Sequence, residues 1–353
     1  MAQVFWGKLM RPNPSLILFL LAVFSTTAAL YSINSSEDYQ RTTADDVIVF
    51  PRLNAKPESA NVLLIETGGL KLKFKQNEGS VWIAEDKFDY PASSKLIQKV
   101  ISQLADMRKI AVKTRMPSRF NQIGVEPYQQ ADANSVFIKL QGADGEILAE
   151  SILGAQFRRN NIGIAEGTFI RHPKEQQAWL ASGSIDIPSD LLSWLDTRIL
   201  NVEANEIKKV KLWEKPGDTA VVVRSNDNGG FVYQNRDGIG YLDREVAKNL
   251  FESLTKLSFV DVWPRKTPGK WQSILYFEVE AYSGSTIAGQ LFRSDSRKIL
   301  QLSVEENALK NIALRDLADT IAYSELNKWS YVIPSWQADR FLEGLKVIEG
   351  GLQ

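Results

Sequence analysis

Alternating hydrophobic and polar positions predict strands early in the chain. In residues 70–75, leucine and phenylalanine side chains alternate with lysines, which is the pattern of a strand with one buried and one solvated face. The segments "NVLLIET" before it and "SVWIAED" after it are also strand-like. The lysine row could be a binding strip, but the pattern favours a solvated face.

An apolar stripe with helical spacing follows these three strands. The stripe predicts a helix that begins near Pro91. It contains Leu96, Ile97, Val100, Ile101 and Leu104. About 146 residues later the same order recurs as the strands "IKKVKLWEK", "TAVVVRS" and "GGFVYQN" and a helix in "DREVAKNLFESLTKL", with Asp243 as the expected N-cap. At this offset Val100 corresponds to Val246.

Two further features recur in the same order. Residues 135–154 and 273–292 each read as a strand, a glycine-containing turn and a second strand, as in a hairpin. The hairpins are followed by Ile-Pro-Ser at residues 187–189 and 333–335, and each of these precedes a helix-like stretch. The first copy has extra residues, which we place in "RMPSRFNQIGVEPYQQADAN".

These recurrences predict a tandem duplication. The expected fold class is α+β, with two copies of a strand-strand-strand-helix-hairpin-helix unit and mixed or antiparallel sheets. The first unit is expected over residues 47–203 and the second over residues 204–353.

The N-terminal region predicts a membrane anchor. Residues 14–33 carry no charge and are long enough, as a helix, to span the roughly 30 Å hydrocarbon core of a bilayer. Lys8 and Arg11 precede the segment, so residues 1–13 are expected in the cytoplasm. Residues 34–46 read as a polar linker. We therefore expect a single-pass protein of the inner membrane with a periplasmic body; a cleaved signal peptide is the alternative.

Small residues in the expected span suggest a contact with another helix. Ala22 and Thr26 lie four residues apart, as do Ser25 and Ala29. Small side chains let helices approach closely in lipid, and hydroxyl groups can hydrogen-bond across the contact. These four residues are the proposed transmembrane helix contact. The alternative is that small residues merely populate the outer end of the span.

Composition excludes several functions. The 353 residues contain 42 Lys and Arg, 42 Asp and Glu, a single histidine and no cysteine. The zero balance argues against a nucleic-acid partner. The absence of cysteine excludes thiolate metal sites and a cysteine nucleophile. No phosphate-binding loop or nucleophile elbow is present. We therefore expect no catalytic, cofactor-binding or metal-binding residues.

Some residues keep other chemistry open. An enzyme that uses only carboxylates would need two acidic groups in a cleft, and Asp186, Asp190 and Asp196 are the candidates considered. His172 lies before Pro173, where a surface turn is favoured over a general base. The nine tryptophans could stack on sugars, although large aromatic side chains more commonly build cores and interfaces.

Several short stretches resemble a known family, domain of unknown function 4340. They include "VWIAEDKFDYPASSKLIQKVISQLADM", "RFNQIGVEP", "GEILAESILG" and "GTFIRHPKEQQAWLASGSIDIPSDLLSWLDTRIL". The resemblance covers the first copy well and the second more faintly. It implies a membrane-anchored protein encoded beside gliding-motility-type ABC-2 permeases, and it supplies no catalytic residues.

The resemblance makes one function the leading hypothesis. It is a non-enzymatic accessory subunit of an ABC-2 transporter complex, with the permease and its ATPase as partners and membrane lipid contacted through the anchor. The alternative is a binding module for envelope glycan or lipid, with a cleft between the two units, because interfaces between domains are favoured ligand sites.

Overall fold

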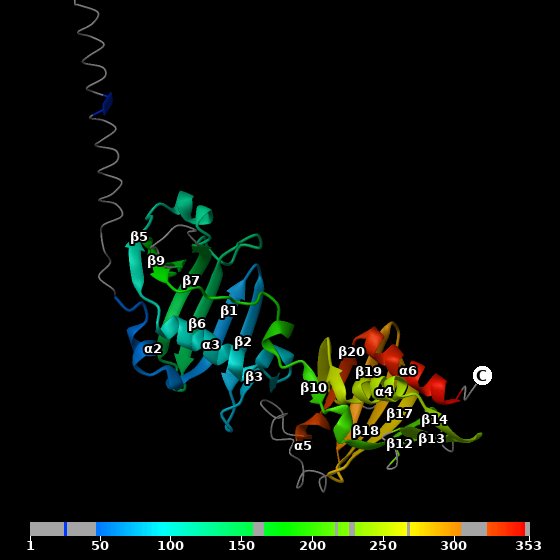
Figure 1. Ribbon diagram of the computed structural model, residues 1–353. Helices are drawn as coiled ribbons and strands as arrows, with labels where there is room; N and C mark the ends of the chain where they lie inside the picture. The colour runs from blue at the N-terminus through cyan, green and yellow to red at the C-terminus, as the bar shows by residue number, and fades with distance from the viewer. Residues whose placement is uncertain are drawn as a thin grey trace, which may run out of the picture.

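The structure is a computed structural model that describes residues 25–26, 47–157, 166–215, 218–225, 230–266, 269–304 and 323–349. It contains two nine-stranded sheets and a small two-stranded sheet. Figure 1 shows two compact units, each formed by one large sheet with helices packed on it. We call them the first and the second sheet unit.

The first sheet has the strand order β4-β3-β2-β1-β6-β7-β8-β9-β5. Its strands are β1 (Ala60–Thr67), β2 (Leu70–Gln76), β3 (Trp82–Ala84), β4 (Tyr90–Pro91), β5 (Lys109–Val112), β6 (Val136–Gly142), β7 (Ile147–Phe157), β8 (Gly167–Arg171) and β9 (Ala178–Ser182). The helices of this unit are α2 (Pro51–Ala55) and α3 (Ser94–Ala105), with short 3-10 turns η1 (Pro57–Ser59), η2 (Glu85–Lys87), η3 (Pro117–Gln122) and η4 (Leu192–Trp194).

The second sheet has the order β14-β13-β12-β11-β17-β18-β19-β20-β16. Its strands are β11 (Ile207–Trp213), β12 (Ala220–Arg224), β13 (Phe231–Asn235), β14 (Gly238–Leu242), β16 (Asp261–Pro264), β17 (Gln272–Ala281), β18 (Thr286–Ser294), β19 (Arg297–Val304) and β20 (Trp329–Ile333). The turn η5 (Ala204–Glu206) precedes this sheet, and its helices are α4 (Arg244–Thr255), α5 (Tyr323–Leu326) and α6 (Ser335–Glu349). Strands β10 (Arg198–Asn201) and β15 (Lys256–Ser258) form the two-stranded sheet.

The predicted fold class is wrong. The protein is mostly β, and every pairing between the described strands is antiparallel. The expected unit of three strands, a helix, a hairpin and a helix contains five strands and so omits four of the nine strands in each sheet. After Ile187-Pro188-Ser189 the expected closing helix is also absent, because that stretch forms only the turn η4 and then β10.

The two nine-stranded sheets have the same strand order, which gives a correspondence between positions. In both units a helix follows the fourth strand, α3 in the first and α4 in the second. Ser93 caps α3 and Asp243 caps α4, each by accepting a backbone N–H in the first turn. Counted from these caps, Val100 corresponds to Leu250, so the offset predicted from the sequence is wrong by one helical turn. Val100 and Leu250 are both buried.

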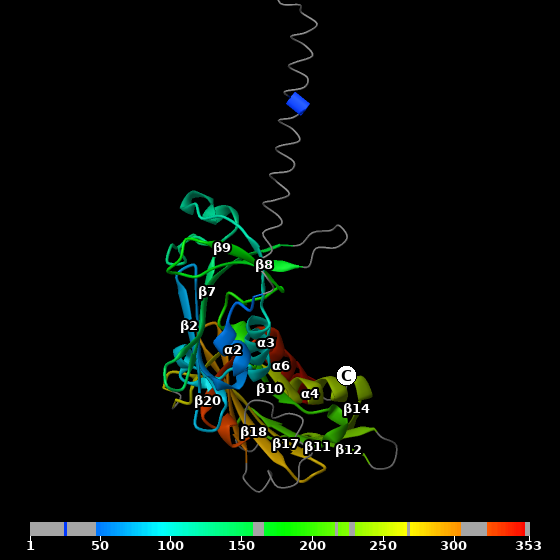
Figure 2. The ribbon, with the colours of Figure 1, turned by 90° about the vertical axis from the view of Figure 1, so that its left-hand side faces the viewer.

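The local sequence explains why the helices pack on one face of each sheet. In β2, Leu72 and Phe74 are buried while the intervening lysines point to solvent. In the second unit α4 and α6 lie together on the sheet, as Figure 2 shows. Gly344 of α6 permits their close approach, since a Cβ there would lie 2.5 Å from Leu250 Cδ1 and would force that side chain to move.

The two units share a continuous hydrophobic core. Ala92 of the first unit forms a β-bridge with Leu195, just before β10 pairs with β15. Lys87 forms an ion pair with Asp261 in β16. The connection between the units is therefore packed rather than a free linker.

Candidate functional site

A pocket lies at the start of the second sheet unit, with a volume of about 380 Å³. This is within the range of small-molecule sites in proteins. Four structural pieces form its walls: β10 with the segment after it, the start of β11, the end of α4, and the β17–β18 hairpin. The site therefore depends on segments that are about 90 residues apart in sequence, from Leu200 to Ile287.

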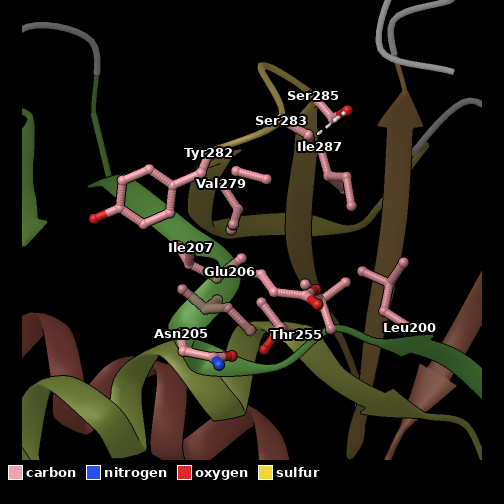
Figure 3. Close-up of a pocket in the computed structure, with 13 residues that line it drawn as sticks. Leu200, Asn205, Glu206, Ile207, Thr255, Val279, Tyr282, Ser283, Ser285 and Ile287 are labelled. Carbon is pink, nitrogen blue, oxygen red and sulfur yellow. Dashed lines mark hydrogen bonds between the residues drawn. The ribbon is translucent and has the colours of Figure 1, made fainter. Parts of the chain in front are cut away.

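The inner lining of the pocket is apolar. Leu254 at the end of α4, Ile207 at the start of β11 and Val279 near the end of β17 are each at most 3% exposed. The apolar lining residues are Leu200, Val202, Ile207, Leu254, Val279, Ala281 and Ile287. Figure 3 shows several of these side chains directed toward one another across the cavity. The interior can therefore accept an apolar group.

Polar groups lie on two sides of the cavity, one formed by the β17–β18 hairpin and the other by η5 and the end of α4. Ser283 donates a hydrogen bond to Ser285 across the turn at 3.1 Å, and the Tyr282 ring lies to one side with its hydroxyl directed away from the cavity (Figure 3). The backbone N–H of Tyr282 donates to the carbonyl of Glu206 at 2.9 Å, which ties the hairpin to η5. Asn205, Glu206 and Thr255 complete the polar lining.

The first sheet unit has a helix at the corresponding place. There α2 precedes β1 and packs against α3 and β7. Its Leu53 is fully buried, and its Asn54 Nδ2 donates to the carbonyl of Ala105 at the end of α3 at 3.0 Å. Arg52 pairs with Glu146 in the β6–β7 turn. Helix α2 thus fills the space between the helix end and the hairpin.

The second unit has a shorter connection at this point. Ile48 is bridged to Arg108 in the first unit, and residues 49–59 then lead to β1. In the second unit Leu200 pairs with Leu257, and only residues 201–206 lead to β11. Of these six residues, Asn201 ends β10 and the last three form η5, so the connection contains no counterpart of α2. The pocket is therefore the position that α2 occupies in the first unit.

Matching hydrogen bonds support this correspondence. The Ala281 N–H donates to the Ser285 carbonyl, as the Gly142 N–H donates to the Glu146 carbonyl in the first unit. The Val202 N–H donates to the carbonyl of Thr255, the last residue of α4. Counted from the caps of the two helices, Thr255 corresponds to Ala105. In the first unit the Ala105 carbonyl accepts its hydrogen bond from Asn54 of α2.

Charged groups around the pocket form ion pairs. Lys208 and Lys209 both pair with Glu280, and their hydrogen bonds lower the pKa of its carboxyl from the usual value. Lys256 pairs with Glu203 and Glu252, and these contacts raise its pKa. Glu280 and Lys256 are therefore charged at neutral pH, and both adjoin residues that line the pocket.

The carboxylates considered for catalysis have local structural contacts. Asp190 accepts hydrogen bonds from the backbone N–H and hydroxyl of Ser193, which lower its pKa. Asp196 pairs with Arg198. His172 accepts a hydrogen bond at Nδ1 from the N–H of Lys174, so it lies in a turn. None of these residues lines the pocket.

The lysine row on β2 is ion-paired. Lys71 pairs with Glu66, while Lys73 and Lys75 both pair with Glu85. Hydrogen bonds from Lys73, which has the larger effect, and from Lys75 lower the pKa of Glu85. The row is therefore a solvated face with its own counterions. Across the described ranges, no group of three or more His, Cys, Asp or Glu residues could hold a metal ion.

The prediction of a single-pass anchor and an inner-membrane location is corrected by the structure. Within the part of the chain that it describes, no helix is long and apolar enough to cross a membrane. The expected span at residues 14–33, with Ala22 and Ala29, lies outside the described residues except for two positions. Ser25 and Thr26 are helical and exposed. They are not part of the pocket.

Fold and site together define a protein built on two large antiparallel sheets, with an apolar pocket in the second sheet unit. Residues 82–271 match the family described as "Domain of unknown function (DUF4340)", and the chain belongs to that family. The match begins at β3 and ends before β17, so it includes the pocket walls from β10, β11 and α4. No curated protein and no solved structure is significantly similar to the chain.

The pocket was not predicted from the sequence. The residues that line it are ordinary strand and helix-end residues, and none carries a motif. The pocket could have been predicted from a difference in length between the segments that precede the first strand of each copy, residues 49–59 and residues 201–206. That difference becomes visible only once Leu200 is matched with Ile48 through their pairings.

Proposed function

We propose that the chain is a non-enzymatic binding protein whose second sheet unit receives a short, leucine-bearing helical turn of a partner protein. One observation carries the proposal: the pocket occupies the position where the first unit binds α2 with Leu53. The same arrangement of helix end and hairpin therefore already holds such a segment once in this chain. The partner segment would supply in trans what α2 supplies in cis.

The physical chemistry of the pocket fits this ligand. Burying one leucine side chain contributes about 1.5–3 kcal/mol. A second apolar side chain of the partner, in the place that Phe50 has in the first unit, would add a similar amount. Ordering of the peptide offsets part of this gain. We therefore expect an isolated peptide to bind with a Kd on the order of 1 mM, and a folded partner to bind more tightly.

The test is a titration of the full chain with a synthetic peptide of residues 49–57, "VFPRLNAKP". The same peptide with Leu53→Ala is the control ligand and should bind at least about tenfold more weakly. In the chain, Ala281→Leu fills the pocket and should prevent binding. Ala288→Leu is the matched control, because Ala288 lies on the adjacent strand opposite Glu278 and does not line the pocket. Equal binding of both peptides would refute the proposal.

A lipid chain is the second candidate ligand. The separation of an apolar interior from hydroxyl groups on the hairpin favours it, because an amphiphile has the same two parts. In this proposal the binding site is the pocket within the second unit, and not the cleft expected between the two units. Titration with dodecanoate distinguishes the candidates: binding of dodecanoate without binding of the peptide would favour the lipid.

The transporter association stays a prediction that rests on the family resemblance. An ABC-2 permease or its ATPase would be one source of the partner segment. Co-purification of the tagged full chain with these proteins, and its loss in Ala281→Leu but not in Ala288→Leu, would link that prediction to the pocket. Recovery of the chain without either protein would count against the association.

A further inference from the structure

Strand β14 is an edge strand of the second sheet with two unusually exposed apolar side chains. Ile239 is 73% exposed and Tyr241 is 83% exposed, the largest values among the exposed large hydrophobic residues. Among the described strands, β14 pairs only with β13. Figure 1 shows it at the end of the second unit that is farthest from the first.

The other three edges of the two large sheets are protected against pairing. Strand β4 has only two residues and contains Pro91, and β16 ends in Pro264. Strand β5 begins with Lys109 and pairs through a register irregularity. Short strands, prolines, charges and bulges are the usual devices that prevent edge pairing. Strand β14 contains five residues, "GIGYL", and none of these devices.

The apolar surface of β14 continues onto its neighbours. Tyr241 is paired with Val232, which is paired with Val223, so the three lie in one row across the sheet. The next row contains Ile239, Gln234 and Val221. All of these side chains lie on the face opposite the buried Tyr233 and Val222. A strand added beside β14 would therefore extend an existing strip that is apolar except for Gln234.

The backbone of β14 can accept such a strand. In an antiparallel pair, hydrogen bonds alternate, so every second residue directs its N–H and C=O away from its partner. Those groups on β14 face the open edge. A peptide that adds a strand gains these hydrogen bonds and places alternate side chains over the strip.

Charge at the two ends of β14 argues against a second copy of this chain as the occupant. The sequence around the strand is "RDGIGYLDR", residues 236–244. Read inward from either end, it begins with an arginine followed by an aspartate. Antiparallel self-pairing that sets Ile239 opposite Tyr241 would also set Asp237 opposite Asp243. Like charges directly opposite each other destabilise a pair of strands. A different segment with basic residues at those positions would avoid this repulsion.

We propose that β14 binds an extended segment of a partner protein in antiparallel orientation. The segment has apolar residues opposite Ile239 and Tyr241 and basic residues opposite Asp237 and Asp243. This surface is separate from the pocket, since none of these residues lines it. The proposal therefore stands or falls independently of the ligand of the pocket.

The probe is the acetylated, amidated peptide Lys-Thr-Val-Thr-Val-Thr-Lys, which has this pattern in the required register. It is titrated into the full chain, and hydrogen–deuterium exchange then locates the protected amides. We expect binding at peptide concentrations on the order of 1 mM and slower exchange in residues 238–242. The double variant Ile239→Lys/Tyr241→Lys should bind at least tenfold more weakly. Trp336→Lys, which replaces an exposed aromatic residue of α6, is the control and should bind as the parent does.

Three outcomes would overturn the proposal. The first is the absence of binding at this concentration, and the second is equal binding by the double variant. The third is a dimer of the free chain in analytical ultracentrifugation that the double variant abolishes, because the occupant would then be a second copy. A thermal unfolding curve of the double variant that matches the parent shows that lost binding reflects the surface and not the fold.

Discussion

The ring of Tyr90 in the first sheet unit packs edge-on against the ring of Trp329 in the second, with 4.9 Å between the ring centroids and an angle of 72°. Tyr90 also contacts Phe259 edge-on at 5.2 Å. It is fully buried, although it belongs to the two-residue edge strand β4. One side chain of the first unit is thus part of the aromatic core of the second.

This relationship predicts a large cost for Tyr90→Ala. The variant should lower the free energy of unfolding by about 3–5 kcal/mol, because truncation of a large buried aromatic side chain leaves a cavity. Urea denaturation followed by tryptophan fluorescence measures the change. Tyr241→Ala is the control, since Tyr241 is 83% exposed and its removal should change stability by less than about 0.5 kcal/mol. Equal effects of the two variants would show that Tyr90 does not connect the units.

The same cluster predicts a loss of stability at alkaline pH. Burial raises the pKa of both Tyr90 and Tyr331 above the ordinary value of 10.0, so the folded protein keeps both hydroxyls protonated when the unfolded chain ionises them. Stability from these groups is complete below pH 10.0 and falls as the pH rises above it. At one unit above the unfolded pKa, each tyrosine should cost about 1.4 kcal/mol.

The measurement is urea denaturation at several pH values of the parent and of Tyr90→Phe/Tyr331→Phe. The phenylalanine variant should lose less stability between pH 10 and 11 than the parent does. Among the described residues the two hydroxyls have no hydrogen-bond partner other than each other, and the double variant removes both, so it should be nearly as stable as the parent at neutral pH. The same alkaline slope in both proteins would contradict the assignment to these two residues.

Leu53 provides the corresponding test in the first sheet unit. Because Leu53 is fully buried in the space that α2 fills, Leu53→Ala should cost about 2–5 kcal/mol. Leu70→Ala, at a position that is 38% exposed, should cost less. Thermal or urea unfolding measures both. A cost for Leu53→Ala no larger than that of the control would show that α2 is not an anchored part of the unit.

The sequence predicted the elements in which local periodicity and tertiary burial agree. The alternation in β2 is real, because Leu72 and Phe74 face the core while the lysines form ion pairs at the surface. The N-cap at Asp243 is confirmed by its hydrogen bonds from the backbone N–H groups of Glu245 and Val246. These features depend on contacts between near neighbours in the chain, so a single sequence contains them.

Other elements depend on distant contacts, and there the prediction was wrong. The stretch after Ser189 has apolar residues at helical spacing, yet it forms a 3-10 turn in which Trp194 Nε1 donates to the Pro188 carbonyl at 3.0 Å. Strands β8 and β16 are short and gain their order from pairing with β9 and β20, respectively. The pocket depends on a connection that is short only by comparison with the first unit. No local pattern encodes these relationships.

Photo-cross-linking can show whether the pocket of the second sheet unit receives a leucine-bearing helical turn. The peptide of residues 49–57 is synthesised with photo-leucine in place of Leu53, irradiated with the full chain and mapped by mass spectrometry. We predict cross-links to the pocket segments around Leu200–Ile207, Leu254–Thr255 and Val279–Ile287, and their loss in Ala281→Leu. Cross-links only outside these segments, or labelling that Ala281→Leu leaves unchanged, would contradict the claim.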